Sequence, residues 1–427
     1  SPTGGIGATI NVKTARPLDT KERIAAIGAK IGYDNSNSRL PGAFQGENLT
    51  PEFSGIYSDT FADGMLGIAI SGSYSKRNSG SNKAYTQGGW RTFTANSGDW
   101  GSIPPAPTSG PDPITNRPTG LYSTSVDMRY SITALERERT NGQLTLQFAP
   151  FKDLRITYDH TIADNKTSKK NAELSSWFNF SFGPTTFTTG APVASPLIQT
   201  ALFPGIDHDL AINTGLYGEK TRLRSNGFNL DWKASSDLRV EADVHSSTST
   251  SKPNSPYGTY STMDFGLFAQ GNAIAYYDKK FPILSLPTTQ FNANRLMLTG
   301  SQFVNNLSDQ SVDQFQTKAT YKLNADNKLN AGLGFTRTKN RAASYNNQNN
   351  DWGGVGAQGD YANVSTRNEN LGSFFSRIEG GAAMVRPFRR GLFSPVGLVA
   401  GPALSATDVT PAGLREKVAG LLAKEGL

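Results

Sequence analysis

Apolar and polar residues alternate along most of the chain, with the period of two that is typical of β-strands whose two faces differ. Residues 23–34 are the first clear case. Their small and apolar positions on one face are Ala25, Ile27, Ala29, Ile31 and Tyr33. The same alternation predicts strands over residues 53–61, 66–74, 144–148, 154–159, 228–233, 238–244, 315–322 and 329–335, and a tenth strand beginning near Leu371.

The connections between these predicted strands are short and long in turn. Short turns fall at residues 62–64, 151–153, 235–237 and 324–327, and Asp63-Gly64 is a strong hairpin signal. Long stretches rich in Gly, Ser, Asn and Pro fall at about residues 35–51, 76–121, 167–217 and 251–308. Outer-membrane β-barrels have short turns on one side, long loops on the other, and strands that are apolar outside and polar inside.

The second face of the predicted strands carries charges, which the core of a sandwich would accommodate only at high cost. The charges assigned to this inward face are Arg155, Asp159, Arg239, Glu241 and Asp243. Trp232 and Phe148 each precede a short turn, as aromatic girdle residues do. We therefore expect an all-β fold, an antiparallel transmembrane β-barrel segment of about nine or ten strands. A water-soluble Greek-key or jelly-roll protein is the alternative, because its strands also alternate.

Composition narrows the functional classes. The chain has 427 residues, 36% of them hydrophobic, and contains no run of about 18 apolar residues that would form a transmembrane helix. It has no cysteine and only three histidines, His160, His208 and His245, so it is poorly supplied for metal sites and catalytic triads. The net charge of +7 comes without a basic run, which disfavours nucleic-acid binding. We predict no enzymatic activity, no cofactor and no metal.

The N-terminal residues carry the most specific motif. Residues 4–17 read GGIGATINVKTARP, in which glycines lead into an alternating strand that Arg16-Pro17 ends. This segment resembles the end of the plug domain in TonB-dependent outer-membrane receptors. The motif residues are Gly4, Gly5, Gly7, Thr9, Asn11, Thr14, Arg16 and Pro17. The resemblance implies that residues 1–18 are the last strand of a plug domain and that residues 19–380 are the N-terminal part of a barrel.

The resemblance also implies a location and a function. Receptors of this family lie in the outer membrane and take up a large, scarce solute, such as a siderophore or an oligosaccharide, with energy delivered by the TonB complex through the plug. The expected partners are outer-membrane lipid, the TonB complex through the plug region missing here, and the imported solute. A passive porin-like channel and a soluble β-rich binding protein are the alternatives.

The C-terminal residues break the pattern. The alternation stops after about Gly380, and Thr410-Pro411 looks like the start of a helix. We expect residues 381–427 to be an irregular or helical tail, foreign to the barrel through a frame change or a joined segment; an outer loop containing a helix is the alternative. Plugged transporters have about twenty-two strands. The chain is therefore expected to be a fragment that does not form a stable transporter alone, since open strand edges are costly in lipid.

Aromatic residues in the long stretches are the candidate ligand contacts. They are Trp177, Phe180, Trp90 and Trp100, all expected in outer loops. Exposed aromatic rings stack on sugars or on the catechol groups of iron chelators, although such rings also pack loops together. His208 is assigned to a solvated loop, and His160 and His245 to polar positions near the upper ends of their strands. For the inward charges, contact with a plug is implied only by the resemblance, and a hydrated wall is the alternative.

Overall fold

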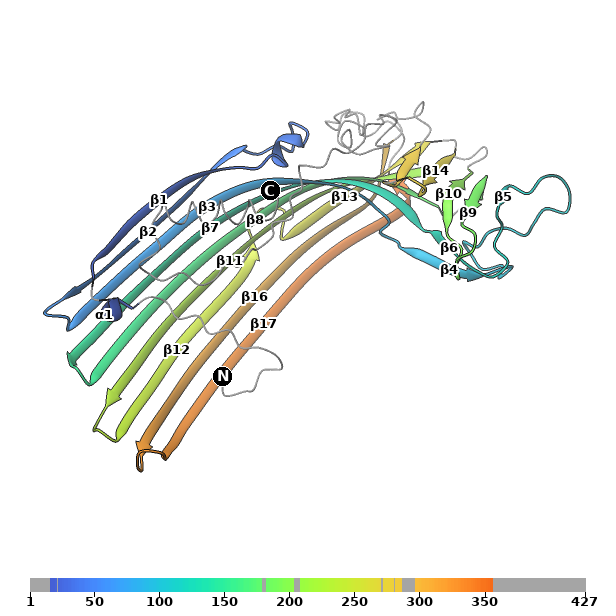
Figure 1. The fold of residues 1–427 in the computed structure, drawn as a ribbon. Coiled ribbons are helices and arrows are strands. Elements are labelled where there is room, and N and C mark those ends of the chain that lie inside the picture. The colour runs from blue at the N-terminus through green and yellow to red at the C-terminus, as the bar shows by residue number, and fades with distance from the viewer. Residues whose placement is uncertain are drawn as a thin grey trace, which may run out of the picture.

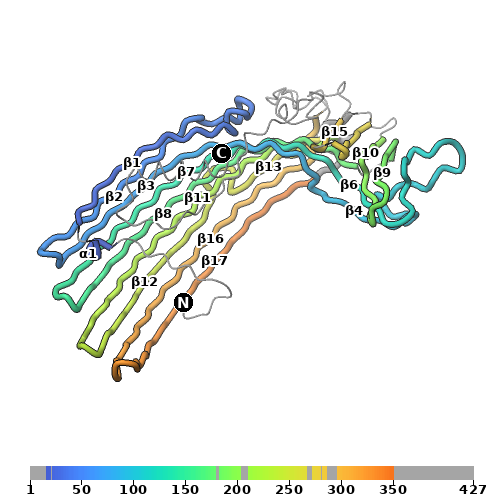
Figure 2. The backbone as a smooth tube through the Cα atoms, in the orientation of Figure 1, coloured from blue at the N-terminus to red at the C-terminus, as the bar shows by residue number. Residues whose placement is uncertain are grey.

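The computed structural model describes residues 16–20, 22–178, 182–202, 208–269, 272–279, 281–285 and 296–355. One ten-stranded antiparallel sheet dominates this part of the chain, and Figures 1 and 2 show its long strands side by side in a strongly curved layer. Its strands are β1 (Ile24–Tyr33), β2 (Leu49–Phe61), β3 (Leu66–Tyr85), β7 (Asp127–Phe151), β8 (Leu154–Trp177), β11 (His208–Lys233), β12 (Leu238–Pro253), β16 (Leu296–Lys322), β17 (Lys328–Val355) and β13 (Tyr260–Ala269).

The nine predicted strands within residues 23–335 all correspond to strands of this sheet, which confirms the all-β, antiparallel class. They pair in chain order from β1 to β17, and the short β13 pairs with both β11 and β16 at their far ends. Within the described residues, β1 and β17 have no partner on their outer edges, so this part of the sheet is open rather than a closed barrel. The tenth strand predicted near Leu371 lies outside the described residues.

Four short connections lie at one end of the sheet, as predicted. They join β2 to β3, β7 to β8, β11 to β12, and β16 to β17. In the first, Ala62, Asp63 and Gly64 have φ of 54°, 55° and 82°, and the Met65 amide donates to the Ala62 carbonyl at 3.0 Å. Left-handed backbone over successive residues is tolerated best by Gly and Asp, which explains why this sequence turns here.

The predicted strand lengths were wrong, because most strands continue far beyond the alternating segments. β7 has 25 residues and β8 has 24, so Trp177 ends a strand instead of lying in a loop. The expected loops also contain short strands: β4 (Trp90–Thr94), β5 (Ile114–Thr115), β6 (Leu121–Ser125), β9 (Thr185–Phe187), β10 (Pro196–Ala201), β14 (Ala273–Tyr276) and β15 (Ile283–Ser285). Backbone pairing to neighbouring strands sustains these segments where no apolar alternation marks them.

Cross-strand register gathers the apolar side chains of the strands on one face near the short turns, here called the apolar face. One row across seven strands is Ile68, Leu146, Tyr158, Phe228, Val244, Phe315 and Phe335. The next row towards the turns is Leu66, Phe148, Ile156, Leu230, Ala242, Thr317 and Leu333. Ile27, Ile31 and Leu333 are 96%, 76% and 75% exposed, so no described element covers this face.

The buried core lies at the opposite end, among the long connections. A five-stranded sheet, in the order β15-β14-β10-β9-β5, and a two-stranded sheet of β4 and β6 form it together with the far ends of the long strands. Tyr122 is fully buried, with its ring 5.5 Å from Phe93 and 5.8 Å from Phe187. A second cluster joins Met128 and Tyr130 to Ala201, Ala273 and Ala275. These connections are therefore folded layers rather than open loops.

The described helices are short. α1 (Pro17–Thr20) starts at the proline that ends the plug-end motif, and η1 (Asn37–Arg39) follows β1. No helix among the described residues is long and apolar enough to cross a membrane. Residues 1–15 of the plug strand predicted over residues 1–18 lie outside the described residues, and Pro17 and Leu18 are helical rather than extended. The helix predicted near Thr410 and the tail predicted over residues 381–427 also lie outside the described residues.

Candidate functional site

The face opposite the apolar face, here called the polar face, holds α1 against the long strands. Arg16 Nη1 donates to both carboxylate oxygens of Asp159 on β8, at 2.6 and 2.7 Å. Thr145 Oγ1 on β7 donates to the same carboxylate at 2.7 Å. The two charged side chains are 30% and 25% exposed, so solvent screens this pair less than a surface pair.

The rest of α1 also fits this position closely. The Leu18 amide donates to Gln147 Oε1 at 2.9 Å, and Gln147 Nε2 donates to Thr157 at 3.2 Å. Pro17 and Leu18 are buried over Gly67 of β3, where an added Cβ would lie 2.9 Å from Pro17 Cγ. Glycine at this position is what allows α1 to approach the sheet.

The charges predicted to face inward do share the polar face; one of them contacts α1 and another contacts Arg16, the residue before α1. Arg155 pairs with Asp19, and Asp159 pairs with Arg16. Arg239 instead donates to Asp231 at 2.7 and 2.5 Å, and it lies 3.5 Å from Glu241. Asp243 lies beside His245, at 3.3 Å. The polar face near the short turns therefore carries a set of ion pairs, of which the Arg155 pair holds α1 and the Asp159 pair holds the residue before it.

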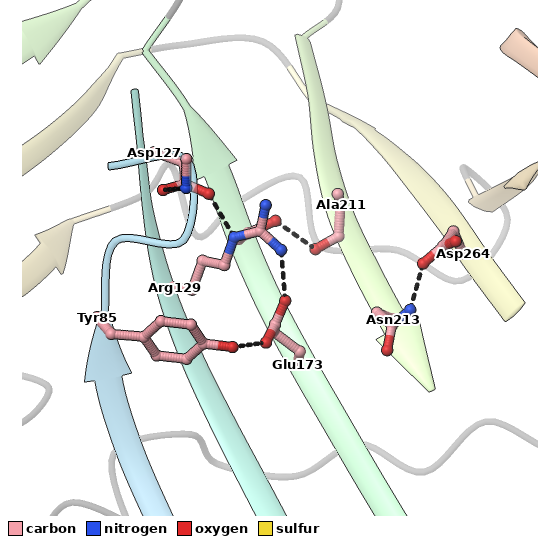
Figure 3. Close-up of polar contacts among 9 residues, drawn as sticks. Tyr85, Asp127, Arg129, Glu173, Ala211, Asn213 and Asp264 are labelled. Carbon is pink, nitrogen blue, oxygen red and sulfur yellow. Dashed lines mark hydrogen bonds and ion pairs between the residues drawn. The ribbon is translucent and has the colours of Figure 1, made fainter. Parts of the chain in front are cut away.

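A second polar cluster lies on the same face at the far end of the strands (Figure 3). Arg129 of β7 donates to Glu173 of β8 at 2.7 Å and also to Asp127, while the Tyr85 hydroxyl of β3 donates to Glu173. Asp127 is fully buried, and the Gly88 amide donates to it at 3.1 Å. The neighbouring strands add Asn213 of β11, which donates to Asp264 of β13. We call Tyr85, Asp127, Arg129 and Glu173 the outer network.

The outer network orders the aromatic residue that the sequence singled out. The Arg129 guanidinium lies over the Trp177 ring, 5.3 Å from its centroid, within the range of a cation–π interaction. Burial, followed by the hydrogen bond to Glu173, raises the pKa of Tyr85 to about 12, so this hydroxyl keeps its proton at neutral pH. The arrangement presents an indole ring held by charge and hydrogen bonds, which suits stacking against a flat group.

The other described candidates for ligand contact pack against different residues. Trp90 begins β4 and packs against Tyr277, with ring centroids 5.0 Å apart. Trp100 is 66% exposed in the connection after β4, with Arg91 4.3 Å from its ring centroid. Phe180 lies outside the described residues, as do the motif residues Gly4, Gly5, Gly7, Thr9, Asn11 and Thr14. The structure thus brings Trp177, but neither Trp90 nor Trp100, into the outer network.

His245 lies on the polar face as expected, whereas His208 and His160 take different positions from those expected. His208 begins β11 rather than lying in a loop. His160 lies in the first half of β8, on the apolar face, with Nδ1 2.8 Å from Asn226 Oδ1. The described residues contain no group of three or more acidic or histidine side chains placed to hold a metal ion.

Sequence reasoning missed Tyr85, Asp127, Arg129 and Glu173. Met128, Tyr130 and Ile132 alternate with polar residues, and this signal could have placed Arg129 on a strand. Glu173 and Arg129 are 44 residues apart, and only the pairing of β7 with β8 brings them together. No signal in the sequence predicts that these four residues contact one another.

Fold and site together define an all-β protein: an open, curved antiparallel sheet with one apolar and one polar face. The polar face holds a short N-terminal helix at one end and a buried charged network at the other. Comparisons with models of protein families, with curated proteins and with solved structures found no match.

Proposed function

We propose that this chain is part of a TonB-dependent outer-membrane receptor, with its apolar face against lipid and its polar face lining the lumen. The observation that carries the proposal is the position of α1. The residues that end the plug-like motif, Arg16 and Pro17, dock on the polar face, opposite the face with exposed apolar rows. A plug that fills the lumen has to contact the wall on this side.

The height of the apolar face fits a bilayer. On β8 the residues of this face from Leu154 to Ile162 are apolar except for His160, which contacts Asn226, and charged residues begin at Asp164. At about 3.4 Å per residue this stretch is roughly 27 Å long. A strand tilt of about 40° reduces its height to roughly 20 Å, close to the band of about 25 Å in outer-membrane barrels.

The two sites on the polar face then take different roles. The outer network and Trp177 lie at the end with long connections, where a solute would first be captured. The ion pairs of Arg16 and Asp19 with the wall hold the end of the plug near the short turns. Energised uptake of a large solute, such as a siderophore or an oligosaccharide, would require the plug contacts to loosen while the wall stays intact.

Two other functions make different demands on the same residues. A passive porin-like channel would conduct ions without any movement of α1. A soluble β-rich binding protein would need the apolar face covered in water, since contiguous exposed apolar patches larger than a few hundred Å² are rare on soluble monomers.

The test is the depth of two tryptophans in lipid. Trp232 is exposed on the apolar face near the short turns, whereas Trp100 is exposed in an outer connection. Two variants of the refolded full chain would each keep one of them, with the chain's other tryptophans changed to Phe. In vesicles of phosphatidylcholine brominated on its acyl chains, we expect strong quenching of Trp232 and little of Trp100. Equal, weak quenching of both would overturn the proposal in favour of a soluble protein.

A further inference from the structure

The same face of the sheet carries a row of four lysines and one glutamate, on the side of the apolar rows that leads towards the long connections. Cross-strand register places Lys76, Glu138, Lys166, Lys220 and Lys252 side by side on β3, β7, β8, β11 and β12. Neighbouring strands lie about 4.8 Å apart, and like charges directly opposite one another are destabilising. We call these five residues the lysine row.

Carboxylates of the chain compensate only part of this charge. Lys166 Nζ lies 3.0 Å from Glu138, and Lys76 Nζ lies 3.0 Å from Glu47. Lys220 has only a long contact, 3.7 Å, to Asp164, which already accepts two 2.7 Å hydrogen bonds from Arg222. For Lys252, which is exposed and directly opposite Lys220, no described carboxylate lies within ion-pairing distance.

Further cations surround the row on this face. On the described strands from β3 to β17, we compare the charged residues that lie on this face above the apolar rows. The cations are twice as many as the carboxylates. The cations are Lys76, Lys166, Lys170, Lys220, Arg222, Arg224, Lys252, Arg337, Lys339 and Arg341, and the carboxylates are Glu136, Glu138, Asp164, Asp309 and Asp313. The uncompensated charge is positive, so it complements an anion.

The height of the row identifies the anion's source. On β8, Lys166 lies four residues beyond Ile162, the last apolar residue of this face before the charged positions Asp164 and Lys166. Four residues rise about 13 Å along the strand and roughly 10 Å along the membrane normal at a tilt of about 40°. Lipid headgroups occupy the first ~5–8 Å outside the hydrocarbon, and a lysine side chain can reach back to them.

We propose that the lysine row binds the phosphate groups of anionic membrane lipids in the leaflet on the side of the long connections. This inference rests on the proposed function, because it requires the apolar face to lie in a bilayer. The lipid's acyl chains would then lie against the apolar rows below, while its phosphates lie between Lys220 and Lys252. The lipids of that leaflet thereby supply the counter-charge that the chain lacks.

The test compares two double variants of the refolded full chain in zwitterionic detergent. Lys220→Gln/Lys252→Gln removes two charges from the row. Lys83→Gln/Lys169→Gln is the matched control, because both lysines lie beyond the apolar rows on the polar face. Native mass spectrometry would measure retention of phosphatidylglycerol against phosphatidylcholine. A cation near an anionic surface contributes roughly fivefold in affinity, so the row variant is expected to lose ten- to thirtyfold and the control less than twofold.

Three results would overturn the inference: equal losses in the two variants, no loss in either, or complete displacement of phosphatidylglycerol by inorganic phosphate at equal concentration. The last outcome would make the row a site for free phosphate. Bromolipid quenching of Trp232 in the row variant separates this inference from the proposed function. Retained quenching with unchanged lipid preference removes the lysine-row site alone, whereas absent quenching removes the membrane assignment as well.

Discussion

Replacing Asp159 with asparagine is expected to loosen α1 from the polar face. In the wild-type chain one nitrogen of Arg16 donates to both carboxylate oxygens, at 2.6 and 2.7 Å. Asparagine keeps the side-chain volume and an acceptor for Thr145, but it removes the charge. Hydrogen bonds to charged groups contribute about 1.5–3 kcal/mol. Since both side chains are about a quarter exposed, solvent screening reduces the expected loss to about 1 kcal/mol.

Hydrogen exchange at one amide measures this loss directly. The Leu18 N–H donates to Gln147 Oε1 at 2.9 Å, so it exchanges only when α1 leaves the sheet. A loss of about 1 kcal/mol raises the population of the open state roughly fivefold, and Leu18 should exchange faster by that factor. The strand amides of β8 should be unaffected, because their ladder bonds do not depend on Arg16.

Asp243→Asn is the matched control. Asp243 is another carboxylate of the polar face, and it contacts His245 rather than α1. Its replacement should leave Leu18 exchange unchanged. The reasoning would be refuted by unchanged Leu18 protection in Asp159→Asn, or by equal acceleration in the control, which would indicate a general effect of net charge.

Three further perturbations follow from the geometry. Gly67→Val should displace α1 and expose its backbone to protease, since a Cβ there meets the helix at 2.9 Å; an unchanged cleavage pattern would argue against the docking. Tyr85 should titrate near pH 12 in ultraviolet difference spectra against Tyr85→Phe. Because its folded pKa lies above the usual 10, its contribution to stability is complete below pH 10 and lost between pH 10 and 12. Hydrogen bonds from the Arg117 side chain and then from the Ile114 amide lower the pKa of Asp112 to about 2. The contribution of ionised Asp112 to folding stability is therefore present above pH 4 and lost as the pH falls from 4 to 2. Arg117→Ala should move the Asp112 carbonyl titration, followed by NMR, back towards 4.

The half of the sheet near the short turns could be predicted because its signals are local. Leu154, Ile156 and Tyr158 alternate with polar residues, and a short turn precedes them. This alternation reflects a sheet with one apolar and one polar face. Successive side chains of a strand point to opposite faces, so the chemistry of each residue indicates the face on which it lies. The same rule predicts that Arg155 and Asp159 lie on the polar face.

The middle of the strands could not be predicted, because its side chains carry no periodic contrast. Residues 136–139 read Glu-Arg-Glu-Arg, with charges on both faces, although they lie in the middle of β7. Such segments are extended because neighbouring strands form hydrogen bonds with their backbone groups. The sequence of the segment alone therefore does not predict the strand, because its stability depends on the strands that pair with it. The outer network is hidden for a different reason: Arg129 lies in an alternating segment with Met128 and Tyr130, but the members of the network meet only through the pairing of β3, β7 and β8.

The position of α1 also distinguishes between the classes of protein considered for this sheet. In a water-soluble sheet protein, a helix or second sheet covers the apolar face, since burial of that face drives folding. Here the arrangement is reversed: α1 covers the polar face through the Arg16 and Asp19 ion pairs, while Ile27 and Leu333 on the apolar face stay exposed. Because burying charged groups is costly unless they are paired, a chain gains from this reversal only where the apolar face meets a medium other than water. The reversal therefore supports the proposal that lipid covers the apolar face, and under that proposal the ion pairs of Arg16 and Asp19 would lie on the lumen side.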